Sequence, residues 1–130
     1  MSTTEVIAAY YKAFNEGDMD AFLALLSDDV VHDINQGQRQ QGKAAFTTFM
    51  QHMNRCYRER LTDIVIMANG ERAAAEFVVH GQYLNSDEGL PPASGQTYVL
   101  PAGAFFLVKA GKVARITNYY NLGDWVEQVQ

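Results

Sequence analysis

The sequence has little of what marks several common classes of protein. Its 130 residues include one cysteine and three prolines, and 10 basic residues stand against 15 acidic ones, which gives a net charge of −5. The single cysteine, Cys56, cannot form an intrachain disulfide, so nothing points to an oxidising compartment. An acidic chain lacks the basic surface that phosphate groups require, which argues against nucleic acid as a main partner.

Long apolar runs and cofactor motifs are also missing. No run approaches the roughly 18 residues of a membrane span, and the first residues lack the pattern of a secretion signal. We therefore expect a cytoplasmic protein without a membrane partner. Glycine-rich phosphate loops are absent, and His32, His52 and His80 show none of the familiar metal-binding spacings, so we expect neither a cofactor nor a metal.

The sequence does contain the patterns of one globular domain spanning residues 1–130. Hydrophobic residues make up 48% and charged residues 19%, close to a globular average. Its first part is helical in pattern: Ser2 and Glu5 form a capping box ahead of a helix that stops at Gly17, Asp18 caps a second helix, and a third covers about 43–54. A short strand is expected at 30–33, followed by a turn at 35–37.

The remainder of the chain is strand-like. Apolar and β-branched residues predict strands over 61–68, 72–84, 96–109 and 112–121, and the 85–95 segment is a long loop of the kind that forms lids or binding rims. Pro101 and Gly103 predict a bulge or bend, or an opening on the pocket side. The tail docks through Trp125. Early helices and late strands indicate an α+β fold, whose long antiparallel strands curl around the helices and leave a small-molecule pocket.

Two strands carry candidate catalytic groups. Alternation places Asp33 opposite His32, and an Asp33 that faced the cavity would have the raised pKa of a general base. The alternative is an exposed aspartate at the end of a strand. Glu76 and His80 share one strand face while Phe77 and Val79 share the other. Either the first pair lines the pocket, or it faces solvent or a dimer partner.

Candidates for substrate binding lie on the later strands. On the last one, Asn118 and Tyr120 alternate together and are expected to face the cavity, where they would position a carbonyl or hydroxyl group. Tyr98 is a further candidate on the preceding strand. The alternative is that these are packing aromatics and an exposed amide.

The order of elements, together with residues 10–18 (YYKAFNEGD) and 25–30 (LLSDDV), resembles the NTF2-like superfamily. Residues 100–106 (LPAGAFF) and 117–125 (TNYYNLGDW) are similar to the ketosteroid isomerase-related, SnoaL-like branch. The resemblance runs from about residue 3 to 126. It implies a cone-shaped, curved antiparallel sheet wrapped around three N-terminal helices, with a central pocket and a homodimer formed through the outer sheet face.

The resemblance also implies roles for individual residues. Asp33 matches the position of the family's general base, and Tyr10 matches the tyrosine that donates to the oxyanion. The family's second oxyanion donor falls at Gly103, which has no side chain to donate. By the same analogy the face of Glu76 and His80 is the concave one, which would favour a substrate smaller or more polar than a steroid.

The function expected from the sequence is therefore small-molecule binding with cofactor-free proton abstraction next to a carbonyl group, of the isomerase or cyclase type. Asp33 would be the base and Tyr10 the oxyanion donor. The alternative is a module of the same fold that binds a small ligand without catalysis or serves mainly for dimerisation.

Overall fold

One curved sheet with helices inside its curve makes up the molecule. The computed structural model describes residues 1–34 and 37–130, so the turn expected at Asn35 and Gln36 lies outside the described residues. The helices are α1 (Thr3–Glu16), α2 (Met19–Ala24), α3 (Lys43–Cys56) and α4 (Leu122–Val129). The strands are β1 (Leu26–Ile34), β2 (Arg39–Gln41), β3 (Tyr57–Asn69), β4 (Arg72–Tyr83), β5 (Thr97–Lys109) and β6 (Lys112–Tyr120).

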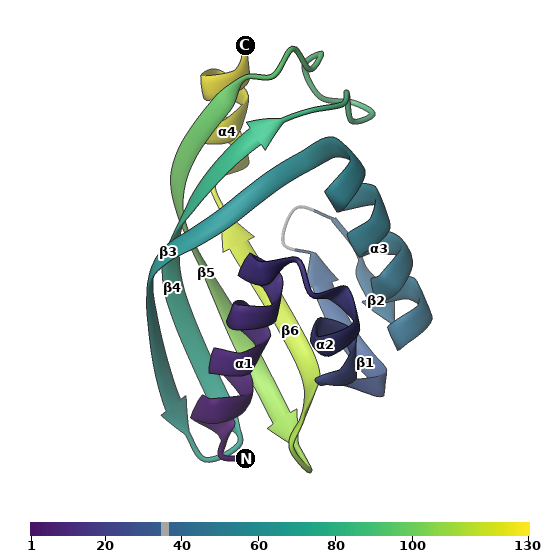
Figure 1. The fold of residues 1–130 in the computed structure, drawn as a ribbon, viewed down its shortest axis with the longest axis vertical. Coiled ribbons are helices and arrows are strands. Elements are labelled where there is room, and N and C mark those ends of the chain that lie inside the picture. Colours follow the sequence, from purple (N-terminus) through teal and green to yellow (C-terminus); the bar gives the residue numbers. More distant parts are fainter. Residues whose placement is uncertain (35–36) are drawn as a thin grey trace.

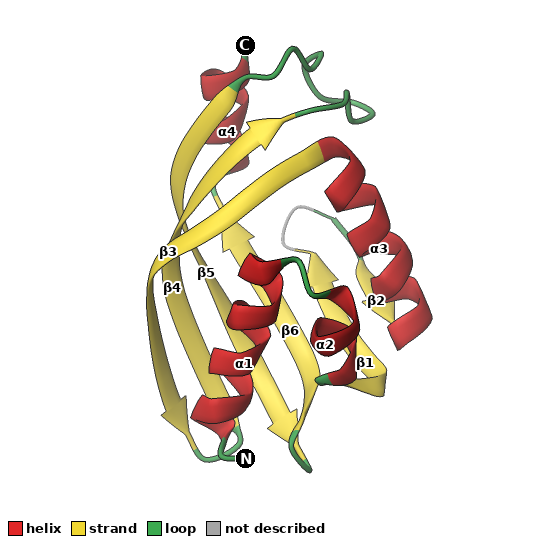
Figure 2. Ribbon diagram, viewed as in Figure 1, coloured by secondary structure: helices red, strands yellow, loops and turns green. Residues whose placement is uncertain are grey.

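The sheet has the strand order β2-β1-β6-β5-β4-β3. Its pairs are antiparallel except where β1 runs parallel to β6. Helices α1, α2 and α3 lie on one side of the curved sheet, and α4 lies at one end, beside the loop that joins β4 to β5 (Figures 1 and 2). This is the α+β architecture expected from the sequence. No helix among the described residues is both long and apolar enough to cross a membrane.

Local signals set the ends of the first two helices. The Ser2 hydroxyl accepts a hydrogen bond from the Glu5 amide at 3.1 Å, and the Glu5 carboxylate accepts one from the Ser2 amide at 2.9 Å. Gly17 ends α1 in the left-handed conformation, with a φ of 67°, which glycine adopts without strain. Asp18 then caps α2 by accepting from the Ala21 amide at 3.1 Å. The capping predicted from the sequence is confirmed.

Alternating burial along β4 decides which face of the sheet packs on the helices. Its buried side chains are Ala73, Ala75, Phe77, Val79 and Tyr83. The ring of Phe77 lies 5.3 Å from that of Tyr11 on α1, measured between ring centroids. Because successive strand residues point to opposite faces, this contact fixes the whole odd-numbered set of β4 on the concave side.

The bends of the sheet arise where the register shifts. Between Thr62 and Val65 the pairing of β3 with β4 slips, and Asp63 there has a positive φ of 55°. A bulge of this kind bends a strand and increases its twist, in keeping with the long curve of β3 (Figure 1). The bulge expected at Pro101 and Gly103 is wrong, because the β4–β5 register runs unbroken through both residues. The alternative, an opening on the pocket side, agrees with the position of Gly103 in the cavity wall.

Pro101 is tolerated within β5 because of where β6 ends. The last pair between these two strands joins Ala102 to Tyr120, so Pro101 lies just beyond the β6 ladder. On that side its missing N–H costs no strand hydrogen bond.

The free edge of β3 is covered by a side chain of α1. β3 is the last strand of the sheet, so the edge groups of Leu61 have no strand beside them. The Asn15 amide takes the place of a strand: its nitrogen donates to the Leu61 carbonyl and its oxygen accepts from the Leu61 N–H, both at 2.9 Å. This pair of bonds ties the end of α1 to the middle of β3.

We expect Asn15→Ala to lower the free energy of unfolding by about 1–3 kcal/mol, because it leaves two edge groups of a buried residue without partners. Urea denaturation followed by circular dichroism measures the change. The control is Lys12→Gln, which breaks an exposed ion pair with Glu16 on the same helix and should cost well under ~1 kcal/mol. Equal effects of the two substitutions would contradict the role assigned to Asn15.

Candidate functional site

A cavity of about 740 Å³ lies between the sheet and the helices. Its volume is in the range of pockets that hold drug-sized molecules. Aromatic side chains from both layers form a large part of its wall, among them Tyr10, Phe14, Phe22, Phe46, Phe49 and Phe77. The loop between β4 and β5 borders the cavity through Leu84, Asp87 and Leu90, as the sequence predicted for a binding rim.

Ring-to-ring contacts connect the aromatic side chains around the cavity. Tyr10 lies 4.5 Å from Phe22 and 5.4 Å from Phe106, between ring centroids, and Phe22 lies 5.9 Å from Phe46. His32 extends this wall, since its ring stacks on Phe46 at 4.4 Å. Such a surface favours flat or ring-containing ligands.

His32 is the polar group buried in this aromatic wall. It is 2% exposed, and burial lowers the pKa of its imidazole, so the ring is neutral at pH 7. Its Nδ1 atom has no hydrogen-bond partner among the described residues. Because this nitrogen is fully buried, His32 contributes the face of its ring to the wall rather than a free hydrogen-bonding group.

A carboxylate, Glu59, stands in the same cavity beside Tyr98. The Tyr98 hydroxyl donates to Glu59 Oε2 at 2.6 Å. The two residues lie on β3 and β5, and Gly81 of β4 is paired with both of them. A Cβ atom at position 81 would overlap the Tyr98 ring. The ring therefore reaches Glu59 by crossing the intervening strand at the one place where that strand has no side chain.

Burial changes the acidity of both groups in this pair. It raises the pKa of Glu59, and the Tyr98 hydrogen bond offsets this only in part. Burial and then the charge of Glu59 raise the pKa of Tyr98 far above its ordinary value, so Tyr98 remains a donor. No cation pairs with Glu59 among the residues the structure describes. A carboxylate with a raised pKa and no counter-ion has the properties of a general base.

A second carboxylate, Asp87, holds the loop at the rim of the cavity. It contacts His52 Nε2 at 2.8 Å and accepts from the Tyr57 hydroxyl at 2.7 Å. Burial by itself would raise the pKa of Asp87, but the hydrogen bonds from Tyr57 and His52 outweigh it and lower the pKa. The Asp87 amide in turn donates to the Tyr83 hydroxyl at 2.9 Å. Asp87 is therefore a fully ionised structural partner rather than a base.

The structure corrects the expected orientation of Asp33. Arg39 Nε donates to its carboxylate at 2.6 Å, and Arg115 Nε and the Thr117 hydroxyl donate at 2.9 and 3.0 Å. The hydrogen bond from Arg39, with those from the other two, holds the pKa of Asp33 well below its usual range. The residue does not line the cavity; its neighbour His32 does. The aromatic rings beneath β1 bury the face of Val30 and His32, which turns Asp33 outward.

The expected orientation of Glu76 and His80 was also wrong. Phe77 and Val79, each 7% exposed, face the cavity, whereas Glu76 is exposed on the outer side of the sheet. His80 lies on that outer side too, with its Nε2 atom 2.9 Å from the Thr62 hydroxyl. The gain from burying Phe77 and Val79 on the concave side decides the face, since exposing them would cost several kcal/mol, about 1.5–3 for each such side chain.

Four other candidates do line the cavity, namely Tyr10, Tyr98, Asn118 and Tyr120. Burial raises the pKa of Tyr10 well above its ordinary value. Burial raises the pKa of Tyr120 as well, and the charges of Glu59 and Asp87 raise it further. The Asn118 side chain has no hydrogen bond to another described residue. Gly103 also lines the cavity, at the position where the family's second donor was expected.

Sequence reasoning missed Glu59, His32 and Asp87 as cavity residues. The signal for Glu59 was present: it alternates with Tyr57 and Leu61, which are apolar or aromatic, whereas Arg58 and Arg60 alternate on the other face. The neighbouring charges of Arg58 and Arg60 hide this pattern, because the segment then has the composition of a solvent-exposed run. No local pattern identifies Asp87, which lies in a loop.

We expect Asp33→Asn to lower the free energy of unfolding at neutral pH by about 1–2 kcal/mol, since it weakens charged hydrogen bonds that are partly exposed to solvent. The pKa of Asp33 is lower in the folded than in the unfolded chain, so its stabilisation is present above about pH 4 and is lost as the pH falls further. Urea titrations from neutral pH down to about pH 3 should show the two proteins converging. A gap that stays constant with pH would contradict this assignment.

The comparison with known proteins agrees with this geometry. A family model described as a SnoaL-like domain matches residues 7–116. No curated protein matches the chain. A crystal structure of a protein from Pseudomonas putida KT2440, provisionally named a polyketide cyclase, is 73% identical, covers 100% of this chain and 99% of its own, and has a TM-score of 0.99.

Two further structures extend the comparison. A protein from Xanthomonas campestris pv. campestris, also provisionally named a polyketide cyclase, is 59% identical over 98% of this chain and 96% of its own, with a TM-score of 0.95. TerC, crystallised with polyporic acid, is 19% identical over 97% of this chain and 96% of its own, with a TM-score of 0.77. At that identity the likeness to TerC shows a shared fold alone.

Proposed function

The chain belongs to the SnoaL-like family of the NTF2-like superfamily, and from this premise we propose that it binds a ring-containing carbonyl compound and catalyses proton transfer next to the carbonyl, as a cofactor-free cyclase or isomerase. The provisional names of the Pseudomonas and Xanthomonas relatives support the cyclase form of this proposal. The size and aromatic wall of the cavity support a ring-containing substrate.

One observation carries the proposal: Glu59 is a carboxylate inside an apolar cavity whose hydrogen-bond partner is a neutral phenol rather than a cation. Burying an ionised group without a counter-charge costs stability, so such groups are concentrated at functional sites. The raised pKa of Glu59, caused by burial, makes it a stronger base than an exposed glutamate. In this proposal Glu59 takes the role that the sequence suggested for Asp33.

The chemistry needs only groups of this chain. Glu59 removes a proton from the carbon next to the substrate's carbonyl, and the C–H electron pair shifts so that the carbonyl oxygen becomes an enolate oxygen. Return of the proton from Glu59 to a different carbon completes an isomerisation. Attack of the enolate carbon on a second carbonyl of the same molecule forms a ring, and the new alkoxide then takes the proton from Glu59.

Hydrogen-bond donors in the cavity stabilise the enolate oxygen in this scheme. Tyr120 lies within the electrostatic influence of Glu59, and Asn118 has an uncommitted amide on the same strand. Tyr10 faces the same cavity and keeps its proposed role as a donor. With no side chain at Gly103, these groups take the place of the family's second donor. Losing one such donor typically costs a factor of about 10²–10³ in rate.

We expect Glu59→Gln to lower the rate of solvent deuterium exchange into cyclic ketones and β-diketones by about 10²–10⁴-fold, because it keeps the shape of the side chain and removes the base. Proton NMR in deuterated buffer measures the exchange. The matched control is Asp33→Asn, the same acid-to-amide change on the other face of the sheet, which should leave the exchange rate nearly unchanged.

Tyr98→Phe separates a positioning role from a structural one. Removing the hydroxyl takes away a bond that favours the ionised carboxylate, so the pKa of Glu59 rises and the acid limb of the pH–rate profile moves to higher pH. Catalysis lost in Asp33→Asn but kept in Glu59→Gln would overturn the assignment of the base. Tight binding of such ketones without any exchange would instead identify a non-catalytic binding module.

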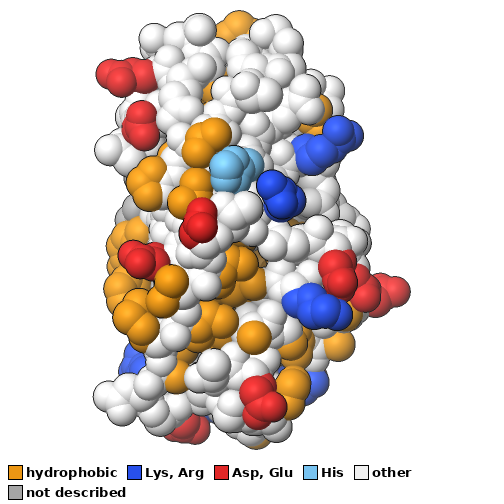
Figure 3. Space-filling model, turned by 60° about the vertical axis from the view of Figure 1, so that its left-hand side comes forward, with side chains coloured by type: hydrophobic (Ala, Val, Ile, Leu, Met, Phe, Trp, Pro, Cys, Tyr) orange, Lys and Arg blue, Asp and Glu red, His pale blue; other side chains and the backbone are white. Residues whose placement is uncertain are grey.

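We further propose that the outer face of the sheet pairs with a second copy of the chain. This face carries exposed apolar side chains, among them Val65 (48% exposed), Met67 (53%) and Phe105 (58%). Figure 3 shows hydrophobic side chains gathered over this side of the molecule, with charged groups around them. Apolar patches of this kind commonly mark protein interfaces.

Phe105→Lys should shift the protein from dimer toward monomer, because it places a charge at the centre of the apolar face. Analytical ultracentrifugation across a concentration series measures the change in mass. Asp20→Lys, a charge change on exposed α2, serves as the control and should leave the mass unchanged. A wild-type chain that is monomeric at all concentrations would contradict the pairing.

A further inference from the structure

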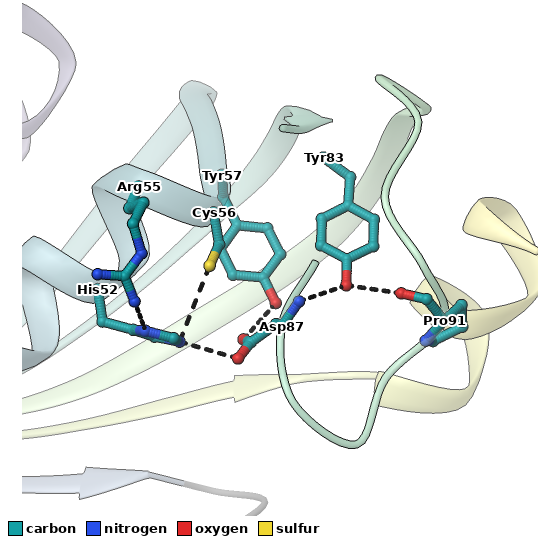
Figure 4. Close-up of polar contacts among 7 residues, drawn as sticks. All are labelled: His52, Arg55, Cys56, Tyr57, Tyr83, Asp87 and Pro91. Atoms are coloured by element: carbon teal, nitrogen blue, oxygen red, sulfur yellow. Dashed lines mark hydrogen bonds and ion pairs between the residues drawn. The ribbon is translucent and has the colours of Figure 1, made fainter. Parts of the chain in front are cut away.

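Three potential metal ligands of different kinds converge at the rim of the cavity. The imidazole of His52, the thiol of Cys56 and the carboxylate of Asp87 place one ligand atom each within 4.8 Å of one another. His52 Nε2 lies 2.8 Å from Asp87 Oδ1 and 4.0 Å from Cys56 Sγ (Figure 4). None of the three is used by the proton-transfer chemistry proposed above.

The elements that carry these groups hold them in place. His52 and Cys56 lie four residues apart in the last turn of α3, so both point to the same side of the helix. The loop is fastened to this turn, since the Cys56 carbonyl accepts from the Leu84 amide at 2.7 Å. Asp87 is fixed at both ends, by the Tyr83 hydroxyl on its amide and by the Tyr57 hydroxyl on Oδ2. The arrangement is therefore built by several independent contacts.

The geometry is not that of a catalytic cysteine triad. In such a triad the acid contacts one imidazole nitrogen and the nucleophile contacts the other. Here Asp87 and Cys56 both approach Nε2, while the guanidinium of Arg55 lies 2.9 Å from Nδ1 (Figure 4). No proton relay can run from Cys56 through the ring to Asp87. The ligand atoms of His52, Cys56 and Asp87 instead surround one point, as the ligands of a metal ion would.

We propose that His52, Cys56 and Asp87 bind a zinc ion at the rim of the cavity, with a fourth coordination position open toward it. Thiolate, imidazole and carboxylate are all ordinary zinc ligands, and three protein ligands with one open position is the pattern of accessible zinc sites. The thiolate disfavours magnesium and calcium, which prefer oxygen ligands. The two negative ligands also balance the charge of the ion.

Only small movements convert the cluster into a tetrahedral site. With metal bonds of about 2.0–2.3 Å, ligand atoms of a tetrahedral site lie roughly 3.3–3.8 Å apart. The distance from His52 Nε2 to Asp87 Oδ1 would therefore lengthen slightly, and that from His52 Nε2 to Cys56 Sγ would shorten slightly. The Cys56 thiol releases its proton to solvent as the metal–sulfur bond forms. The proton on Nε2, which Arg55 favours by donating to Nδ1, moves to Nδ1 through solvent, and the exposed Arg55 side chain turns away.

The direct test is zinc binding by the reduced, chelator-treated chain, measured by isothermal titration calorimetry. We expect one zinc per chain. Cys56→Ser and Asp87→Asn should each weaken binding at least about 10-fold, because each removes a ligand. Glu88→Gln is the matched control, since Glu88 is an exposed acid beside Asp87 in the same loop and should leave the affinity unchanged.

Two further measurements keep the test independent of whether these variants fold. Cobalt in place of zinc should give the intense visible bands of a tetrahedral site and a thiolate-to-cobalt charge-transfer band in the unmodified protein. Arg55→Ala should tighten zinc binding several-fold, because Arg55 competes for Nδ1 and repels the ion. Equal zinc affinity in the wild type and Cys56→Ser, or a cobalt spectrum without the sulfur band, would overturn the proposal. The cluster would then serve only to hold the β4–β5 loop against α3 by hydrogen bonds.

Discussion

The burial of Phe77 and Val79 on the concave side of the sheet, with Phe77 packed on Tyr11 of α1, is the interaction on which the cavity depends. It decides which face of β4 is concave, and the pleat then sets the direction of every side chain on the neighbouring strands through the register. Reversing it would turn Glu59 and Tyr98 outward and bring Glu76 and His80 inward. The burial of apolar side chains on one face of β4 therefore determines which carboxylate faces the cavity.

The contact between Tyr98 and Glu59 also requires a glycine at position 81. Glu59 and Tyr98 lie on strands separated by β4, and an ordinary residue at position 81 would stand between them. Gly81 leaves a gap through which the Tyr98 ring reaches the carboxylate at 2.6 Å. The acid is thereby held in one orientation by a neutral donor. Burial keeps the pKa of Glu59 raised, because this donor lowers it only in part and no cation stands beside it among the described residues.

Much of the fold could be predicted because its signals are local. The capping box at Ser2, the stop at Gly17 and the cap at Asp18 each act within a few residues, and all three were predicted correctly. The positions of the long strands could likewise be read from apolar and β-branched residues, although β3 begins at Tyr57 rather than at Leu61 and β1 spans Leu26–Ile34 rather than 30–33. The bulge expected near Pro101 is not formed, because the proline lies just past the end of the β6 ladder and interrupts no strand hydrogen bond there. The position of that end depends on a strand distant in sequence, so it could not be read locally.

The site was harder to predict because alternation offers two faces and does not choose between them. For β1 and β4 the analogy with the family pointed to the faces of Asp33 and Glu76, whereas packing on the helices selected those of His32 and Phe77. Counting apolar residues on each face would have selected correctly for β4. The cluster at the rim was beyond such reasoning, since Asp87 comes 35 residues after His52 and reaches it only through the loop.

The central claim is that Glu59 is a buried base held by Tyr98. Carbon NMR of the chain labelled at its glutamate carboxyl groups, with Glu59→Gln to assign the signal, measures its titration directly. We expect Glu59 to titrate above the ordinary glutamate pKa of about 4.3, and Tyr98→Phe to move the titration higher still. A Glu59 that titrates at or below that ordinary value, with no response to Tyr98→Phe, would contradict it.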